Sequence, residues 1–328
     1  MKTFGTFALA VSGIVLVYFL PALLGGSTAL YSAFVLIAIF AVMSYGLDII
    51  VSDLGEVSLA HPVFFASGAY TTAILSVRYG FDPISTLLGT VIVSLVLAAF
   101  LGYITLRLRE FVFSLVTYAF TVVGLTLAQD WSFLGGSDGI TGIPLFSVGV
   151  GSFRYTAPTD RALWPVALLL LLVTLYLINA FRRSRLGKAA LAVHLNSRLA
   201  TMSGNDPQRT RLYVFMFSAP ITAAGGWLYA YQRAYVSADV LSQYFLILML
   251  TAVVLVGRGM LFAPLIAVAI ILVQEKFFSF GGYIDSIVLG CALIISLAFL
   301  PGGVVGSIRA LRARFAPRRT TQPVDQTV

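Results

Sequence analysis

Apolar residues fill most of this chain in long runs that are separated by short polar segments. About ten runs are long enough, or nearly so, to cross the ~30 Å hydrocarbon core of a bilayer as a helix. The runs cover residues 7–24, 30–47, 57–77, 84–106, 111–128, 163–180, 212–231, 244–256, 261–278 and 284–300. Only residues 257–260 separate the eighth run from the ninth, so these two could also form one interrupted span. The pattern predicts an all-α integral membrane protein, a polytopic helical bundle of about ten transmembrane helices.

Composition supports the same fold class. The chain has 328 residues, of which 59% are hydrophobic and 10% are charged, whereas soluble domains carry roughly 25% charged residues. Polar residues gather in an outer loop, 130–162, in a basic loop, 181–211, and in a C-terminal tail, 309–328. We therefore expect one transmembrane domain over residues 1–308 and a basic, disordered tail over residues 309–328.

Lysine and arginine are distributed unevenly among the polar segments. If the N-terminus lies inside, sixteen of the 21 fall on inside segments and five fall outside, as the positive-inside rule requires. Both termini and the 181–211 loop are therefore expected to be cytoplasmic (N-in, C-in). The net charge of +8 belongs to this basic face and does not indicate a nucleic-acid partner, because no aromatic-interleaved basic patch accompanies it.

The N-terminal run has a second interpretation as a secretory signal. Lys2 precedes an apolar stretch, and the small residues 25–27 could mark a cleavage site. The run is long for a signal core and lacks an A-x-A-like site, which favours a retained first span.

Residues suited to catalysis are sparse. The chain has no G-x-x-x-x-G-K-[ST] phosphate loop, so ATP hydrolysis by this chain is not expected. His61 and His194 have no acidic neighbour in sequence, and Cys291 lies in an apolar run, which gives no support for a metal site or a catalytic triad. Acidic residues map to loops and span ends apart from Glu275, which can pair with Lys276, so no ion-coupling machinery is visible. We expect neither an enzyme nor a bound cofactor.

The basic loop contains a short amphipathic helix over residues 189–202. Gly204 suits a left-handed C-cap and Pro207 cannot continue the helix. Mostly small apolar side chains form one face at alternating +4 and +3 spacing: Leu186, Ala190, Val193, Ser197 and Ala200. A helix of this kind lies on lipid headgroups or fills a groove on a soluble partner. The small side chains favour close protein packing.

A possible helix break lies at Pro62, which cannot donate a backbone hydrogen bond. Non-helical backbone at membrane depth occurs only where it is buried in protein or faces a cavity. Ser58 and His61, beside the break, are therefore candidates to line a pathway. The alternative is that residues 58–62 form the interfacial start of the next helix.

The outer loop has a glycine-rich centre at residues 134–144. Four glycines in eight residues indicate tight turns with positive φ, and Asp138 can cap or bind locally. The segment is either a compact loop packed on the bundle, or an outer lid or docking surface for a soluble partner.

Four stretches occur in the order and spacing of one known family. Residues 55–70 read GEVSLAHPVFFASGAY, similar to G-x-x-S-L-G-H-x-x-F-x-x-x-G-A-Y, and residues 135–144 read GGSDGITGIP, similar to GG-x-DG-x-x-GIP. Residues 184–204 read SRLGKAALAVHLNSRLATMSG, and residues 300–306 read LPGGVVG. Together they resemble the permease subunits of the high-affinity branched-chain amino-acid ABC importers, of the LivM type. Glu56, Ala60, Pro62 and the residues 193–196 depart from the family pattern, which leaves the substrate and the detail of ATPase docking open.

The resemblance implies a transport subunit of a bacterial inner-membrane ABC importer that works by alternating access. Its implied partners are a sister permease subunit, two cytoplasmic ATP-binding subunits that use the ATP, and an extracytoplasmic solute-binding protein. Its implied substrate is a branched-chain amino acid or a related solute such as urea, an amide or a small carboxylate. The alternative is a stand-alone secondary transporter or channel, which would not need the cytoplasmic helix and would show intramembrane acids.

The candidate functional residues form three sets. The substrate-path set is Ser58, His61, Ser67 and Tyr70. The ATPase-coupling set is Lys188, Ala190, Val193, His194, Arg198, Ala200 and Gly204. The outer-loop set is Gly136, Asp138 and Gly139. Within the coupling set, the small-residue face is expected to insert into a cleft on an ATPase subunit.

Overall fold

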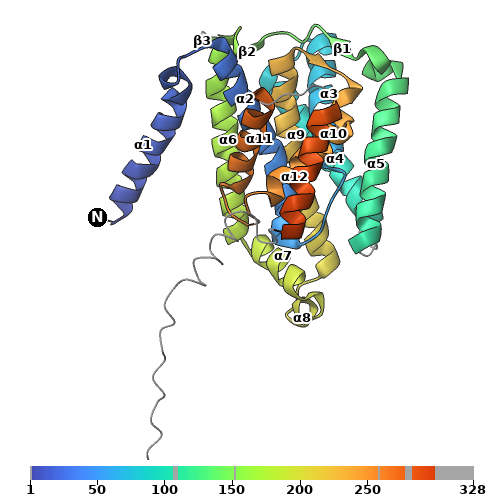
Figure 1. Ribbon diagram of the computed structural model, residues 1–328. Helices are drawn as coiled ribbons and strands as arrows, with labels where there is room; N and C mark the ends of the chain where they lie inside the picture. The colour runs from blue at the N-terminus through green and yellow to red at the C-terminus, as the bar shows by residue number, and fades with distance from the viewer. Residues whose placement is uncertain (1, 106–109, 151–152, 258, 278–282, 300–328) are drawn as a thin grey trace, which may run out of the picture.

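The computed structural model describes residues 2–105, 110–150, 153–257, 259–277 and 283–299 of the chain. Helices make up most of this part (Figure 1). They are α1 (Lys2–Leu23), α2 (Thr28–Asp48), α3 (His61–Tyr79), α4 (Pro83–Thr105), α5 (Glu110–Asp130), α6 (Asp160–Arg183), α7 (Arg185–Leu195), α8 (Ser197–Met202), α9 (Pro207–Arg233), α10 (Gln243–Val254), α11 (Ala263–Phe277) and α12 (Tyr283–Phe299). The expected tail, 309–328, and the stretch 300–306 lie outside the described residues.

Within the described residues, five helical stretches are long and apolar enough to cross a membrane: Thr28–Leu54, Pro83–Thr105, Phe111–Asp130, Asp160–Arg183 and Pro207–Arg233. Shorter apolar helices cover Ser12–Leu23, Gln243–Val254 and Ala263–Glu275. These helices confirm a multi-pass membrane protein, while the count of ten spans stays a prediction. Two distinct helices lie in this part of the chain: α10 ends at Val254, α11 begins at Ala263, and the two pack against each other.

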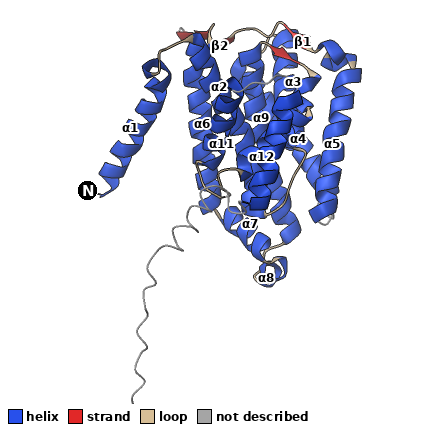
Figure 2. Cartoon of the chain, viewed as in Figure 1, coloured by secondary structure: helices blue, strands red, loops and turns tan. Residues whose placement is uncertain are grey.

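The expected outer loop contains β-structure that the all-α prediction missed. β2 (Phe146–Val150) pairs antiparallel with β3 (Phe153–Ala157), and β1 (Ile140–Thr141) pairs antiparallel with β4 (Tyr235–Val236), which follows α9. Figure 2 shows these strands in red at the end of the bundle opposite α7 and α8. Alternation of apolar and small residues along β2 gives the two-residue period of a strand. We call this end of the molecule the strand end, and the opposite one the α7 end.

The centre of the bundle is α9, which packs against α2, α3 and α4, while α2 packs against α6. Glycine lets these helices approach closely. A Cβ on Gly226 would lie 1.9 Å from the carbonyl oxygen of Phe65, and a Cβ on Gly68 would lie 2.0 Å from that of Ala223. The backbones of α3 and α9 are therefore in direct contact, as is common in membrane helix packing that relies on small residues.

Two helices lie at the edges of the bundle. Figure 1 shows α1 standing apart from the other helices and α5 on the opposite side. The indole Nε1 of Trp164 in α6 donates a hydrogen bond to the carbonyl oxygen of Tyr18, 3.0 Å away. Large apolar side chains on both edge helices are exposed, which is the pattern of surfaces that face lipid or another protein.

Candidate functional site

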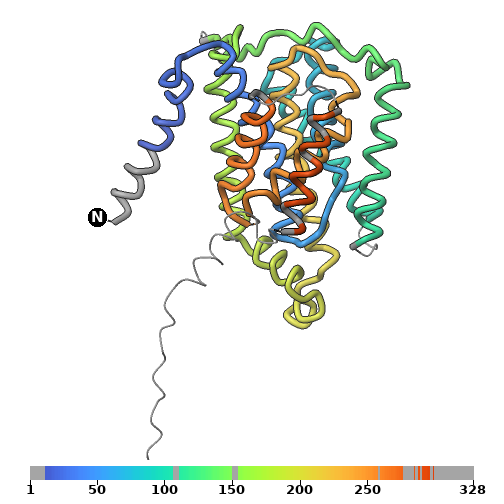
Figure 3. Tube along the Cα trace, viewed as in Figure 1, coloured from blue at the N-terminus to red at the C-terminus, as the bar shows by residue number. Residues whose placement is uncertain are grey.

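The chain between α2 and α3 breaks its helical path over residues 49–60, which we call the broken segment. After α2 it widens into a π-helix, η1 (Ile49–Leu54), and ends at Gly55, whose φ of 79° is in the left-handed region that glycine readily adopts. Residues 55–60 form no regular structure until α3 begins at His61, with Pro62 in its first turn, where the missing N–H of proline removes no helical bond. Figure 3 shows the stretch between η1 and α3 rising from the α7 end beside the helices. The expected span at residues 57–77 therefore begins four residues late, at a helix start.

Hydroxyl groups of α5 satisfy this non-helical backbone. Ser114 Oγ donates to the carbonyl oxygen of Val57 (2.7 Å), Thr121 Oγ1 donates to that of Leu59 (2.6 Å), and the Leu59 N–H donates to Thr117 Oγ1 (3.1 Å). The three hydroxyl residues share one face of α5, because they are three and four residues apart. Thr121 lies about 16 Å along α5 from Glu110, at 1.5 Å per residue. The broken segment therefore reaches well into the bundle, as it can only where protein groups replace water.

Ser58 and His61 lie at the end of the broken segment, and both side chains are fully buried. Ser58 Oγ lies 3.1 Å from His61 Nδ1. The rings of Phe64 and Phe215 surround the imidazole edge-to-face, at centroid distances of 5.5 and 6.1 Å. In this conformation the pair is packed in the core, and its role in a pathway stays a prediction.

Ser67 and Tyr70 lie six and nine residues after His61 in α3 and line a different space. They face a cavity of about 380 Å³ between α3, α4 and α5, whose other lining residues are almost all apolar. Ser67 Oγ donates to the carbonyl oxygen of Phe64 (2.8 Å). The Tyr70 hydroxyl is buried and has no hydrogen-bond partner among the described residues. The structure thus divides the substrate-path set into a packed pair and a pair on a cavity.

Buried ion pairs tie the broken segment to the start of the 181–211 loop. Arg182 contacts Asp48 (2.7 Å) and Asp53 (3.1 Å), and it donates to the carbonyl oxygen of Gly259 (3.1 Å). Asp48 is only 1% exposed and also accepts from Ser52 Oγ (2.5 Å). Because an isolated buried charge is costly, this cluster holds α2, η1 and α6 in one arrangement.

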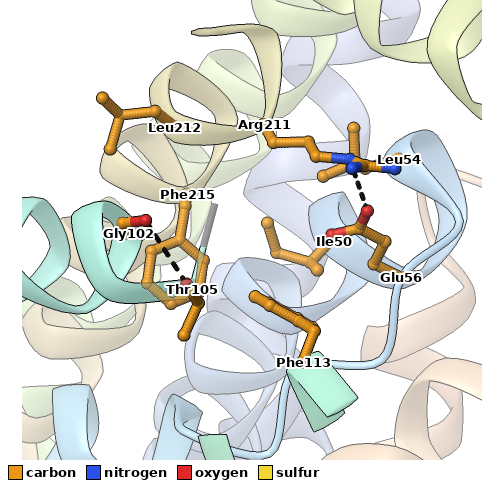
Figure 4. Close-up of a pocket in the computed structure, with 9 residues that line it drawn as sticks. All are labelled: Ile50, Leu54, Glu56, Gly102, Thr105, Phe113, Arg211, Leu212 and Phe215. Atoms are coloured by element: carbon orange, nitrogen blue, oxygen red, sulfur yellow. Dashed lines mark hydrogen bonds and ion pairs between the residues drawn. The ribbon is translucent and has the colours of Figure 1, made fainter. Parts of the chain in front are cut away.

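A second ion pair ties the broken segment to the end of the same loop. Arg211 Nε lies 2.6 Å from Glu56 Oε1, and Figure 4 shows the two side chains reaching toward each other above the rings of Phe113 and Phe215. The cavity that they border is about 10 Å³, room for about one water molecule. This part of the α7 end is therefore closed to a solute.

Sequence reasoning assigned no partner to Asp48, Asp53 or Glu56, which lie between the second and third apolar runs. Their partners lie far away in the chain: Arg182 is 134 residues from Asp48 and 129 from Asp53. The available signal was the opposite charge of two of the predicted inside segments. Sequence reasoning therefore missed the ion pairs and the α5 hydroxyl groups. It did identify the segment around Pro62 as a possible break, and both groups of contacts stabilise that segment.

The 189–202 helix is two helices in the structure, α7 and α8. Asn196 separates them, because its Oδ1 accepts hydrogen bonds from the N–H groups of Arg198 and Leu199 and caps α8. Gly204 has the predicted left-handed conformation, with φ of 81°. The prediction of one continuous helix is thus wrong, and the prediction of its C-terminal cap is confirmed.

The small-residue face of these helices points into this chain. Ala190, Val193 and Ala200 are buried, and α7 packs on α6, α9 and η1. Small side chains allow that close approach, so the expectation that this face enters a partner is wrong for this structure. The coupling role of α7 and α8 stays a prediction. If these helices contact an ATPase subunit, they do so through the opposite face.

The opposite face combines apolar and basic side chains. Leu191, Leu195, Leu199 and Met202 project outward, and Leu195 and Met202 are 76% and 84% exposed. Lys188, His194 and Arg198 are exposed beside them. We call Leu191, Leu195, Leu199 and Met202 the exposed ridge. His194 also lies on the broken segment, because a Cβ on Gly55 would come within 2.6 Å of its ring.

The glycine-rich outer segment is packed on the strand end. Gly136 and Gly139 have positive φ, as predicted, and a Cβ on Gly139 would lie 2.4 Å from the carbonyl oxygen of Val236. Arg78 Nη2 donates to the carbonyl oxygen of Phe133 (2.7 Å), and its guanidinium lies 4.5 Å from the Phe133 ring centroid. Asp138 is exposed. The compact-loop interpretation describes the structure, and a lid or docking role stays a prediction.

Comparison with known proteins places these features in a family. Residues 29–298 match the family model described as "Branched-chain amino acid transport system / permease component". The chain is 28% identical over 291 residues to the high-affinity branched-chain amino acid transport system permease protein LivM of Escherichia coli (strain K12), and 29% identical over 292 residues to its namesake of Salmonella typhimurium. Each match covers 83% of this chain and 68% of the relative. No solved structure matches the chain. The chain, a multi-pass membrane protein with a transport role, belongs to the family of branched-chain amino acid transport permease components.

Proposed function

We propose that this chain is the permease subunit of an ABC importer for branched-chain amino acids or a related small polar solute. It forms the translocation path in a bacterial inner membrane together with a sister permease subunit. Two cytoplasmic ATP-binding subunits use the ATP, and an extracytoplasmic solute-binding protein delivers the solute. The family of the chain supports this assignment, since its named relatives are high-affinity branched-chain amino acid transport permeases.

The proposed topology has ten spans, α1 to α6 and α9 to α12, with both termini and the α7 end in the cytoplasm. The uneven distribution of lysine and arginine supports it. Under this topology, α7 and α8 project from the cytoplasmic face, and β1 to β4 lie outside.

The observation that carries the proposal is the exposed ridge at the α7 end. Four large apolar side chains face outward on two helices whose other face is fixed to the bundle. Lys188 and Arg198 lie beside the ridge and do not interrupt it. Its continuous apolar surface therefore suits a hydrophobic groove on a soluble protein. Arg182 and Arg211 connect the two ends of this segment to the broken segment. A push on the ridge would therefore reach residues 55–61 through ion pairs and direct packing.

The experiment places an aspartate on the ridge, with Leu195→Asp and Leu199→Asp as the variants. The matched control is Leu145→Asp, because Leu145 is similarly exposed but lies at the strand end. Burying one leucine side chain stabilises a contact by about 1.5–3 kcal/mol of binding free energy. Each ridge variant should therefore lower ATPase co-purification and uptake roughly tenfold or more. The control should lower neither. Normal ATPase association and normal uptake in both ridge variants would leave a stand-alone transporter as the better assignment.

A further inference from the structure

The cavity of about 380 Å³ between α3, α4 and α5 opens to the side of the bundle. Three of its lining residues are exposed on the outer surfaces of these helices: Val93 of α4, and Val123 and Leu127 of α5. Most residues in the apolar stretches of α4 and α5 are likewise not buried within this chain. In a membrane-spanning bundle, such surfaces meet lipid or another membrane helix. The occupant of the cavity therefore comes from within the membrane.

The cavity is long and narrow. Its lining residues on α3 run from Val63 to Ile74 along one face, a rise of about 16 Å at 1.5 Å per residue. That length is about half of the ~30 Å hydrocarbon core, which is the depth of one lipid leaflet. A helix about 10 Å wide would occupy roughly 1,200 Å³ over the same length, about three times the volume of the cavity. The shape therefore suits a single hydrocarbon chain and excludes a helix of a partner.

The deep part of the cavity has apolar walls. Phe120 of α5 and Leu241 of η4 (Ala238–Leu241) line it, and η4 packs against both α3 and α5. Gly124 leaves space there, because a Cβ on this residue would only touch Val63 and Leu241, at 3.6 and 3.9 Å. An empty space of this size would deprive its walls of dispersion contacts, which a hydrocarbon chain restores. Lipid tails are as apolar as these walls, so polar groups must fix which part of a lipid binds.

Polar groups follow on α3 toward the strand end. Tyr70 lines the cavity, and its buried hydroxyl has no hydrogen-bond partner among the described residues. Arg78 lies about 12 Å further along α3. Its guanidinium lies 4.5 Å from the ring centroid of Phe133, which lies 5.3 Å from that of Trp131, a half-exposed residue of the cavity wall. Arg78 donates to the carbonyl oxygen of Phe133, and a guanidinium has five N–H donors in all, so donors are left for an anion.

We propose that this cavity binds one acyl chain of a membrane phospholipid, with an ester carbonyl at Tyr70 and the phosphate at Arg78. Along α3 the chemistry changes from apolar at Val63 to a hydroxyl at Tyr70 and a cation at Arg78. Chain, ester and phosphate follow one another in the same order in a phospholipid. The Tyr70 hydroxyl donates to the ester, the Arg78 guanidinium binds the phosphate, and Trp131 lies at the headgroup level, where tryptophan is common. This lipid site does not rest on the proposed transport function.

The test places the full chain in nanodiscs of phosphatidylglycerol, a small part of which carries a photoactivatable diazirine on one acyl chain. Mass spectrometry of the digested protein then locates the cross-links. We expect a cross-link at Leu241, which is buried and lines the cavity. Val122 of α5 is exposed and lies outside the cavity lining, so its cross-link measures ordinary contact with the bilayer.

Variants distinguish the cavity from the general lipid surface. Gly124→Leu fills the cavity and should lower the Leu241 cross-link roughly tenfold or more, without lowering the one at Val122. Its matched control is Gly290→Leu in α12, because a Cβ on Gly290 would have nothing within 4 Å. Tyr70→Phe removes one hydrogen bond and should lower the Leu241 cross-link roughly fivefold.

Arg78→Gln tests the phosphate contact and should also lower the Leu241 cross-link roughly fivefold. The matched control is Arg161→Gln, because Arg161 is also exposed at the strand end and lies 5.7 Å from the ring centroid of Tyr31. The comparison uses variants whose midpoint of thermal unfolding equals that of the unmodified chain.

Three results would overturn the proposal. The first is a cross-link at Val122 without one at Leu241 in the unmodified chain. The second is a Leu241 cross-link that is equally strong in the unmodified chain, Gly124→Leu and Arg78→Gln. The third is loss of the Leu241 cross-link when the sister permease subunit is assembled with the chain, because side chains of that subunit would then fill the cavity. A Leu241 cross-link that persists in the assembly and depends on Gly124, Tyr70 and Arg78 supports the lipid site.

Discussion

The two ends of the molecule handle charge in opposite ways. At the α7 end, Arg182 and Arg211 are paired with buried carboxylates, and the adjoining cavity has room for about one water molecule. At the strand end, Arg233 and Glu275 border an open cavity of about 310 Å³ and do not pair with each other. All four ion pairs between side chains that the structure describes lie at the α7 end.

The difference indicates that the two ends of the bundle have different structural roles. Paired, desolvated charges fix the relative positions of helices, because separating them exposes an uncompensated charge to a low-dielectric surrounding. At the strand end, by contrast, the helices leave a cavity between them. The α7 end is thus built to keep α2, η1, α6 and α9 together as a unit, whereas the helices of the strand end are packed less closely around a cavity of about 310 Å³.

The largest expected effect is at Arg182. Arg182→Ala would leave Asp48 and Asp53 without their cation in a buried site, at a cost of about 3–5 kcal/mol. The midpoint of thermal unfolding of the purified chain in detergent should fall sharply. The control is Arg183→Ala, the exposed neighbour, which should change stability by no more than ~0.5 kcal/mol. Equal effects of the two substitutions on the unfolding midpoint would contradict the claim that the Arg182 ion pairs hold the helices of the α7 end together.

A smaller effect is expected where α5 holds the broken segment. Thr121→Val keeps the shape of the side chain but removes the donor to the Leu59 carbonyl, which should cost about 1–3 kcal/mol. Amide hydrogen exchange of residues 57–60 should accelerate. Thr126→Val is the matched control, because the Thr126 hydroxyl donates to the carbonyl of Val122 in its own helix. Unchanged exchange at residues 57–60 would show that the hydroxyl does not support the break.

The smallest effect belongs to the strand end. Arg78 holds the outer segment by one hydrogen bond and a cation–π contact at an exposed site, and such contacts contribute about 0.5–1 kcal/mol. Arg78→Ala should therefore lower the unfolding midpoint far less than Arg182→Ala, while limited proteolysis within residues 131–139 becomes faster. A loss of stability as large as that of Arg182→Ala would contradict the contrast between the two ends.

Much of this architecture could be predicted from the sequence because it depends on local patterns. Long apolar runs gave the helices, and the glycines gave the left-handed positions at Gly136, Gly139 and Gly204. Pro62 marked the start of α3. These features follow from backbone conformation and hydropathy over a few neighbouring residues.

The remaining features depend on contacts between distant residues. The small face of α7 could pack on the bundle or on a partner with equal physical justification, and only the tertiary structure shows Ala190 inside and Leu195 outside. The Arg182 ion pairs join residues more than a hundred positions apart. Strands β2 and β3 were missed because each is only five residues long, and an alternation over so few residues is a weak signal.

The most direct test of the account is the amount of solute taken up per ATP hydrolysed, measured with the assembled transporter in proteoliposomes. The variants are Glu56→Arg, Arg211→Glu and the double exchange, which restores an ion pair in reversed orientation. We predict that each single variant keeps its ATPase subunits but transports several-fold less solute per ATP, and that the double exchange recovers much of the loss. Wild-type uptake per ATP in both single variants would contradict the claim that the α7 end transmits the action of the ATPase to the broken segment.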